Sequence, residues 1–177
     1  MRVALPVADI GRAARDTDLI HAVAATYDEV DARIARKAPV CVNRGWCCRF
    51  GAFGHRLYVT STELAYFLSG FSDDLRAGSD DGYCPYQVAG RCHARQHRPL
   101  GCRIFFCDVM SQGWQSPLTE RTLGRLRTIG DVAGLPYVYI DWTEALRAMG
   151  GVVTPDEADP PVAGGLVVSI DTRRDRS

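Results

Sequence analysis

The sequence predicts a small α+β domain, mostly helical, in which short strands and two cysteine-rich loops converge on a metal site. Three observations lead to this fold class. Apolar residues recur every three or four positions in the longer segments, stretches with strand character span only a few residues, and seven cysteines lie in two groups between them. With 177 residues, 46% of them apolar, the chain is long enough for one domain with one hydrophobic core.

The longest clear helical pattern lies near the start of the chain. Apolar side chains recur there at the spacing of one helix face: Leu19, Val23, Tyr27, Val30 and Ile34. Asp16 or Thr17 is a suitable cap for the first turn, and Pro39 cannot continue a helix. The sequence therefore predicts a helix from Asp16 to Lys37.

A short strand and a second helix are predicted after the first cysteine group. Residues 57–59 have strand character. Thr60 and Glu63 have the spacing of a capping box, in which each side chain bonds to the backbone N–H of the other residue, so a helix is predicted through Leu68. Residues 69–82 are polar and rich in Gly, Ser and Asp, and are predicted to form a mobile loop.

Two further elements are predicted in and after the second cysteine group. Residues 86–91 have the character of a small hairpin, with Gly90 in its turn. Ser116 and Pro117 are a typical start for a helix, because proline is favoured at the first helical position, and Gly134 is a typical end.

The predicted domain closes with a strand and a helix. Residues 137–140 have strand character, and the sequence from Asp141 to Glu144 is a capping sequence for a helix that ends at Gly150. The remainder is rich in Pro and Gly and ends in charged residues, which predicts an extended arm with a disordered tip. The expected organisation is one domain over residues 1–150 and an arm over residues 151–177.

The overall charge argues against several classes of partner. The 21 basic and 21 acidic residues give a formal net charge of zero, whereas a sequence-independent nucleic-acid binder normally carries a basic excess. No run approaches the roughly 20 apolar residues of a membrane span, and no signal peptide is recognisable. We therefore expect a cytoplasmic protein that binds neither nucleic acid nor membrane. A protein or redox partner stays open.

The cysteines are the candidate metal ligands: Cys41, Cys47, Cys48, Cys84, Cys92, Cys102 and Cys107. In a reducing cytosol such a set is more often metal-binding or catalytic than a disulfide framework. Thiolate is the soft ligand that zinc and iron–sulfur clusters prefer, and four thiolates complete either kind of site. For any cysteine taken alone, the competing interpretation is a buried core residue.

The spacing of the cysteines excludes the commonest short motifs. It runs Cys-x5-Cys-Cys, then 35 residues, then Cys-x7-Cys-x9-Cys-x4-Cys, with no Cys-x2-Cys. Zinc-finger knuckles and the thioredoxin redox motif are therefore missing. We rank Cys47, Cys84, Cys92 and Cys102 as the strongest ligand candidates, followed by Cys41 and Cys48, with Cys107 last.

Arginines surround the same region of the sequence: Arg44, Arg49, Arg91, Arg95, Arg98 and Arg103. They would offset the negative charge of a thiolate cluster or receive an anionic partner, or else form a solvated rim. Aromatic residues also flank the thiols and would shield a cluster from water, although aromatic residues are as often ordinary core.

Four segments together resemble a known family. They are the runs CVNRGWCCR (41–49), YCPY (83–86), RC (91–92) and RPLGCR (98–103). These motifs resemble those of the YkgJ-like CxxCxxCC cysteine cluster proteins, a family described as zinc- or iron-chelating. The resemblance covers roughly residues 22–108. One position departs from the family pattern, because Arg44 stands where the family has its second cysteine.

The resemblance implies metal chelation and little more about activity. Related cysteine-rich segments occur in flagellin lysine N-methylases, where they suggest an iron–sulfur cluster and methyl transfer. This chain has no separate S-adenosylmethionine fingerprint, so that activity is not carried over.

Three functions remain open from the sequence. The favoured one is a metal-binding cysteine cluster protein with an iron–sulfur cluster, or a chelated zinc or iron ion, that supports electron or group transfer. The second is a non-catalytic domain with structural zinc. The third is a thiol redox sensor in which Cys47 and Cys48 form a reactive pair. No catalytic triad or phosphate loop is recognisable, so whether the protein is an enzyme is undecided.

Overall fold

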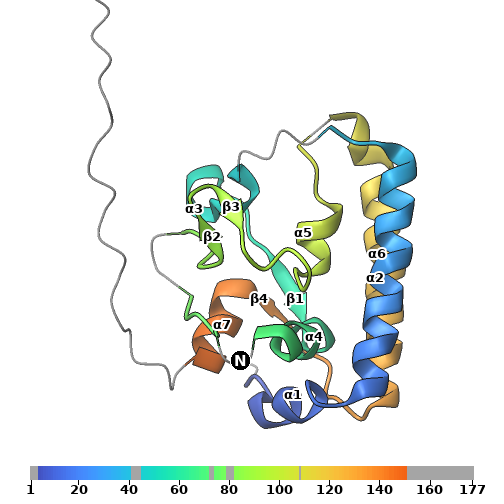
Figure 1. Cartoon of the computed structure of the whole chain (residues 1–177), viewed down its shortest axis with the longest axis vertical. Coiled ribbons are helices and arrows are strands. Elements are labelled where there is room, and N and C mark those ends of the chain that lie inside the picture. Colours follow the sequence, from blue (N-terminus) through green and yellow to red (C-terminus); the bar gives the residue numbers. More distant parts are fainter. Residues whose placement is uncertain (1–3, 41–44, 72–73, 79–81, 108, 151–177) are drawn as a thin grey trace, which may run out of the picture.

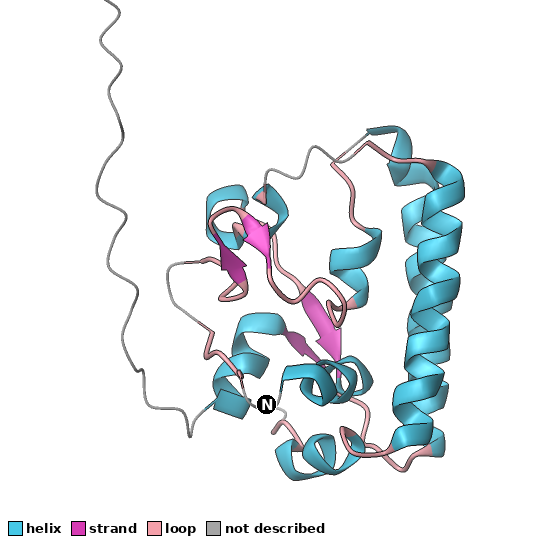
Figure 2. Ribbon diagram, in the orientation of Figure 1, coloured by secondary structure: helices cyan, strands magenta, loops and turns pink. Residues whose placement is uncertain are grey.

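The computed structural model describes residues 4–40, 45–71, 74–78, 82–107 and 109–150. It is a mixed structure of helices and short antiparallel strands, with 61% of the described residues in helices, which confirms the α+β class (Figures 1 and 2). In chain order the elements are α1 (Val7–Ala13), α2 (Thr17–Lys37), the 3-10 helix η1 (Trp46–Cys48), α3 (Phe50–Phe53), β1 (Tyr58–Thr60), α4 (Ser61–Phe71), β2 (Gln87–Val88), β3 (Arg91–Cys92), α5 (Leu100–Ile104), the 3-10 helix η2 (Val109–Ser111), α6 (Gln112–Val132), β4 (Tyr139–Asp141) and α7 (Trp142–Gly150).

The long helix α2 confirms the first predicted helix. The Asp16 carboxylate caps it by accepting from the backbone N–H groups of Asp18 (3.0 Å) and Leu19 (3.1 Å). The helix ends at Ala38, whose left-handed conformation (φ 46°) turns the chain before Pro39. In Figure 1, α2 lies alongside α6, and the two form one wall of the molecule.

The helix α6 begins earlier than the sequence predicts. It starts at Gln112 instead of Ser116, so Pro117 lies inside the helix. Pro117 has no N–H to bond to the Gly113 carbonyl, so α6 lacks one backbone bond in its second turn. The predicted end near Gly134 is confirmed, since Gly134 adopts φ 64° just beyond the helix.

The strands β1 and β4 pair in antiparallel fashion and connect two helices. Tyr58 lies opposite Asp141, and Thr60 lies opposite Tyr139. Each strand runs directly into a helix, β1 into α4 and β4 into α7. The Asp141 carboxylate caps α7, as predicted, by accepting from the N–H of Thr143 (2.9 Å).

The small hairpin is confirmed as β2 paired with β3. Its turn residues, Ala89 and Gly90, both have positive φ angles of 48° and 77°. Two consecutive residues with positive φ fit the tight turn that matches the twist of a two-stranded ribbon.

Three α-helices have no counterpart in the sequence prediction, namely α1, α3 and α5. All three are seven residues or shorter, so none carries enough repeats of the helical spacing to be recognised. The predicted loop over residues 69–82 is wrong at its start, because α4 continues to Phe71. Cys41 and the predicted arm over residues 151–177 lie outside the described residues. No described helix has the length and apolar character needed to cross a bilayer.

The capping box at the start of α4 is confirmed and extends into the core. Glu63 Oε2 accepts from the Thr60 N–H (2.7 Å), while Thr60 Oγ1 accepts from the Glu63 N–H (3.2 Å). The Glu63 side chain is only 2% exposed. Its Oε1 accepts from the first N–H of α5, at Leu100 (2.8 Å), and from the Tyr27 hydroxyl of α2 (3.3 Å). One buried carboxylate thus joins α2, α4 and α5.

Arg103 is the second polar residue that holds α5 in place. Its side chain is 6% exposed and lies over the Tyr27 ring, 4.2 Å from the ring centre. The guanidinium donates to Asp31 Oδ2 (2.7 Å), to the Arg98 carbonyl (3.0 Å) and to the Gln96 carbonyl. These bonds fasten both α5 and the turn before it to α2.

Replacing Arg103 with methionine is expected to lower the free energy of unfolding by about 2 kcal/mol, because the carbonyls of Gln96 and Arg98 lose their donor and Asp31 loses its ion pair. Urea denaturation monitored by circular dichroism measures the change. The matched control is Arg125→Met, which breaks the exposed ion pair with Glu29 (2.8 Å) and should change stability by less than about 0.5 kcal/mol. Equal effects in the two variants would contradict this account of Arg103.

Candidate metal centre

Five cysteine thiols line one cavity of about 120 Å³: Cys47, Cys48, Cys84, Cys92 and Cys102. They come from three segments that are distant in the sequence. The turn around η1 supplies the first pair, the segment that includes the β2–β3 hairpin supplies the next two, and α5 supplies the last. The expectation that the two cysteine groups lie together therefore holds for these five residues.

The first segment enters the site through a glycine turn. Gly45 has φ 66°, and a Cβ there would lie 2.7 Å from the Gly90 carbonyl oxygen, so only glycine fits this close approach. The Gly45 carbonyl accepts from the Cys48 N–H (3.2 Å) and from the Gln87 side-chain amide (2.6 Å). These bonds place η1, with Cys47 and Cys48, directly beside the hairpin.

Backbone bonds also join the first segment to the second. The Cys84 N–H donates to the Cys48 carbonyl (2.9 Å), and the Gly51 N–H donates to the Gly82 carbonyl (2.9 Å). Because the peptide groups of the two cysteine residues bond directly, the positions of their thiols do not depend on long flexible loops.

The described cysteines differ in exposure. Cys48 and Cys84 are buried, Cys92 and Cys102 are partly buried, and Cys47 is exposed. Cys107 is also exposed, but it does not line the cavity. All six described cysteines are free thiols.

Hydrogen bonds among three thiols change their acidity. The Cys48 thiol lies beside the sulfurs of both Cys47 and Cys84, and hydrogen bonding within this group lowers the pKa of Cys47 to about 6 and that of Cys84 to about 7. The same bonds raise the pKa of Cys48 above its ordinary value, so Cys48 retains the proton. Burial raises the pKa of Cys92 and Cys102. Two of the five thiols are therefore readily ionised, and thiolate is the form that binds metals.

Two buried N–H groups at the cavity have no hydrogen-bond partner of normal geometry among the described residues. They are the indole Nε1 of Trp142 and the Nε of Arg98. Trp142 lies against Cys84 and helps to lower the pKa of that thiol. A buried donor without a partner is costly in a finished structure, so both groups indicate that an acceptor belongs in the cavity.

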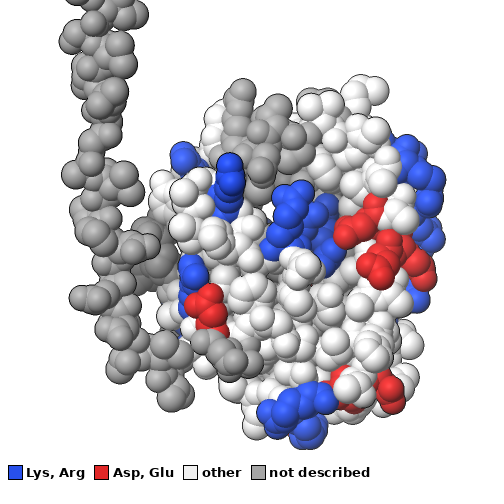
Figure 3. Space-filling view, viewed as in Figure 1, with Lys and Arg blue, Asp and Glu red and all other residues white. Residues whose placement is uncertain are grey.

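The cavity is basic as well as sulfur-rich. Three arginines line it, Arg95, Arg98 and Arg103, and its described lining contains no aspartate, glutamate or histidine. Figure 3 shows a group of basic side chains in the region of α5, with both acidic and basic side chains along α2. The positive charges of these arginines would offset the negative charge of several thiolates.

The sequence identified Arg98 only as one of several nearby arginines, and it did not identify Trp142 as part of the site. Trp142 is about 60 residues from Cys84, so no local pattern connects them. His97 packs against Tyr66 with ring centres 5.0 Å apart and does not line the cavity. Among the described residues, no three Cys, His, Asp or Glu side chains are placed to hold a metal ion together.

Comparison of the chain with family models, with curated proteins and with solved structures finds no match. The resemblance to the cysteine cluster family therefore rests on the motifs themselves and stays a prediction.

Proposed function

We propose that the protein binds an iron–sulfur cluster, or a single zinc or iron ion, through thiolates drawn from Cys47, Cys48, Cys84, Cys92 and Cys102. The observation that carries the proposal is that these five thiols line one cavity without any other metal-binding side chain. An all-sulfur donor set suits iron–sulfur clusters and structural zinc, whereas catalytic zinc sites usually include histidine. A bound cluster would supply electron transfer.

The cavity volume and the partnerless donors support the same proposal. About 120 Å³ is well below the roughly 300–1,000 Å³ of a typical organic ligand site, so a metal ion or small cluster fits better than a large coenzyme. The Trp142 indole would donate to the Cys84 thiolate, and such N–H···S bonds stabilise metal-bound sulfur. Binding would require the cysteine side chains to turn toward one centre, since they are not so arranged in the described structure.

The first test is elemental analysis with an absorption spectrum on protein purified without oxygen. Iron with acid-labile sulfide and broad visible absorption is the expected result for a cluster. Zinc in a colourless protein would support the single-ion form of the proposal and a structural role. Protein that contains no metal, and takes up neither iron with sulfide nor zinc on reconstitution, would contradict the proposal.

The Trp142→Phe variant tests the role of the indole N–H. It keeps an aromatic ring in the core but removes the donor, and metal affinity is expected to fall about tenfold, as for other partners of metal ligands. Competition with a chelator measures this affinity. Trp114→Phe on α6, which lies outside the cavity lining, is the control. Equal metal affinity in both variants would exclude an N–H···S bond from Trp142.

A second candidate function is thiol redox sensing. Two observations favour it. Cys47 is exposed and adjacent to Cys48, and the Cys84 thiol also lies beside the Cys48 thiol. Oxidation would join two of these thiols in a disulfide as they lose two electrons to an oxidant such as a peroxide. Metal analysis separates the two functions, because a sensor of this kind would be isolated free of metal and with rapidly alkylated thiols.

A further inference from the structure

The thiol cavity borders a groove on the neighbouring surface, and two of its cysteines line both. A cavity of about 170 Å³ is lined by Cys47 and Cys102 together with the apolar residues Phe50, Leu57 and Phe105. It shares two polar residues, His55 and Arg56, with a larger cavity of about 360 Å³. The two cavities thus form one groove with an apolar end at the thiols and a polar end at α7.

The apolar end has the size of a single ring. An apolar cavity of about 150 Å³ accommodates benzene, which is close to the volume found here. Gly101 contributes to this space, because a Cβ at this position would lie 2.6 Å from Leu57 Cδ1. The His55 and Phe105 rings are stacked with centres 6.1 Å apart, and Phe105 is 51% exposed, so an aromatic surface is accessible from solvent.

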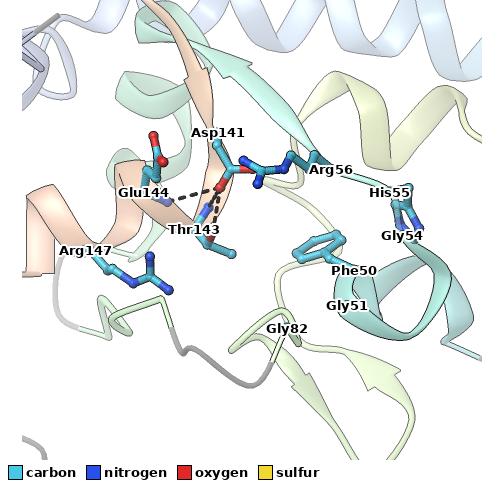
Figure 4. Close-up of a pocket in the computed structure, with 10 residues that line it drawn as sticks. All are labelled: Phe50, Gly51, Gly54, His55, Arg56, Gly82, Asp141, Thr143, Glu144 and Arg147. Carbon is cyan, nitrogen blue, oxygen red and sulfur yellow. Dashed lines mark hydrogen bonds between the residues drawn. The ribbon is translucent and has the colours of Figure 1, made fainter. Parts of the chain in front are cut away.

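The polar end favours an anion. Figure 4 shows Arg147 extending into this cavity from α7 and Arg56 extending toward Asp141 at its edge, while the Glu144 carboxylate points away from it. Asp141 Oδ1 is already engaged, since it accepts from the backbone N–H groups of Thr143 and Glu144 and from the Thr143 hydroxyl. Arg56 forms no ion pair with any described residue.

We propose that this groove binds a small amphipathic carboxylate, with its apolar ring between Leu57 and Phe105 and its carboxylate toward Arg56. The inference deepens the proposed function, because the ring would lie beside Cys47 and Cys102 of the metal site. Guanidinium groups match carboxylates in shape and charge, and the apolar end excludes a ligand that is polar throughout.

The test is a titration with three ligands of equal size: benzoate, benzyl alcohol and benzylamine. Binding is followed by nitrogen-15 chemical shifts of the backbone amides, in metal-free protein and in protein loaded with the metal that analysis identifies, or with zinc. Benzoate is expected to bind about tenfold more tightly than benzyl alcohol, because only benzoate forms a charge-assisted bond. Shifts at Arg56, Leu57 and Gly101 are expected. Tighter binding of benzylamine, or benzoate shifts elsewhere only, would overturn the proposal.

Two variants place the ligand in the groove. Arg56→Gln should weaken benzoate binding about tenfold and leave benzyl alcohol binding unchanged, whereas Gly101→Ala should weaken both by narrowing the apolar end. Arg12→Gln, on the exposed surface of α1, is the control. Unchanged benzoate affinity in Arg56→Gln would overturn the proposal. Metal content is measured on each sample. Absence of metal uptake would contradict the metal proposal, whereas absence of selectivity for benzoate would contradict the groove proposal, so the two failures are distinguishable.

Discussion

Replacing Glu63 with glutamine is expected to lower the free energy of unfolding by about 3 kcal/mol, although the two side chains have nearly the same shape. Each carboxylate oxygen accepts a backbone N–H, Oε2 from Thr60 and Oε1 from Leu100. In glutamine one of these positions becomes an NH₂ group, so in either orientation a donor faces a buried donor. Rotation of the side chain cannot relieve this conflict.

Urea denaturation of Glu63→Gln measures the loss of stability. Glu120→Gln, an exposed position on α6, makes the same chemical change where water replaces lost bonds, and should stay within about 0.5 kcal/mol of the parent. A Glu63→Gln protein as stable as the Glu120→Gln protein would show that the carboxylate does not hold α4 and α5 together.

The same residue predicts a pH dependence. Burial raises the pKa of Glu63 above its ordinary value, and this effect outweighs the bonds that favour the ionised form. Folded protein therefore keeps the proton at pH values where the unfolded chain has lost it. Its contribution to stability is full below the ordinary carboxyl pKa and falls as pH rises through the raised value. Comparing stability between pH 4 and 8 should show this component in the parent protein and not in Glu63→Gln.

Replacing Cys102 with serine is expected to remove most of the bound metal, whereas replacing Cys107 is expected to leave metal content unchanged. Cys102 lies on α5 in the cavity wall, while Cys107, five residues later, is exposed and outside the lining. Serine is nearly isosteric with cysteine but is a poor ligand for zinc or iron–sulfur clusters. The two variants therefore compare the same substitution inside and outside the site.

Metal content and thermal unfolding are measured on both serine variants purified without oxygen. Loss of metal should lower the melting temperature of Cys102→Ser, because a ligand bound only by the folded state adds to its stability. Full metal content in Cys102→Ser would remove Cys102 from the ligand set. Equal loss in both variants would assign Cys107 to the site, against its position in the described structure.

The sequence predicts those parts of the fold that depend on local chemistry. The Asp16 cap, the capping box at Thr60 and the turn at Gly90 each involve residues within a few positions of one another, and all three are confirmed. The sequence places the start of α6 too late, at Ser116 and Pro117, because proline is favoured at the first helical position. The helix begins at Gln112, so Pro117 lies in its second turn.

The candidate site was predictable only in part. Thiols were a recognisable signal because of their number and grouping, and five of them line one cavity. Residues that make contacts between distant segments show no such pattern in the sequence. Trp142 reaches Cys84 only because β1 and β4 pair, and Glu63 reaches Leu100 only because α5 packs beside α2 and β1. Such contacts are set by tertiary packing, which a single sequence does not specify.

The backbone bond between Cys84 and Cys48 has a consequence for how a metal would be acquired. Closing a flexible loop of 35 residues costs about 3 kcal/mol of chain entropy, and the backbone bonds between the two cysteine segments offset part of that cost. A metal bound here would stabilise the folded state further, because it would bind thiolates that only the fold brings together. The exposed thiol of Cys47 would be the first point of transfer from a donor molecule.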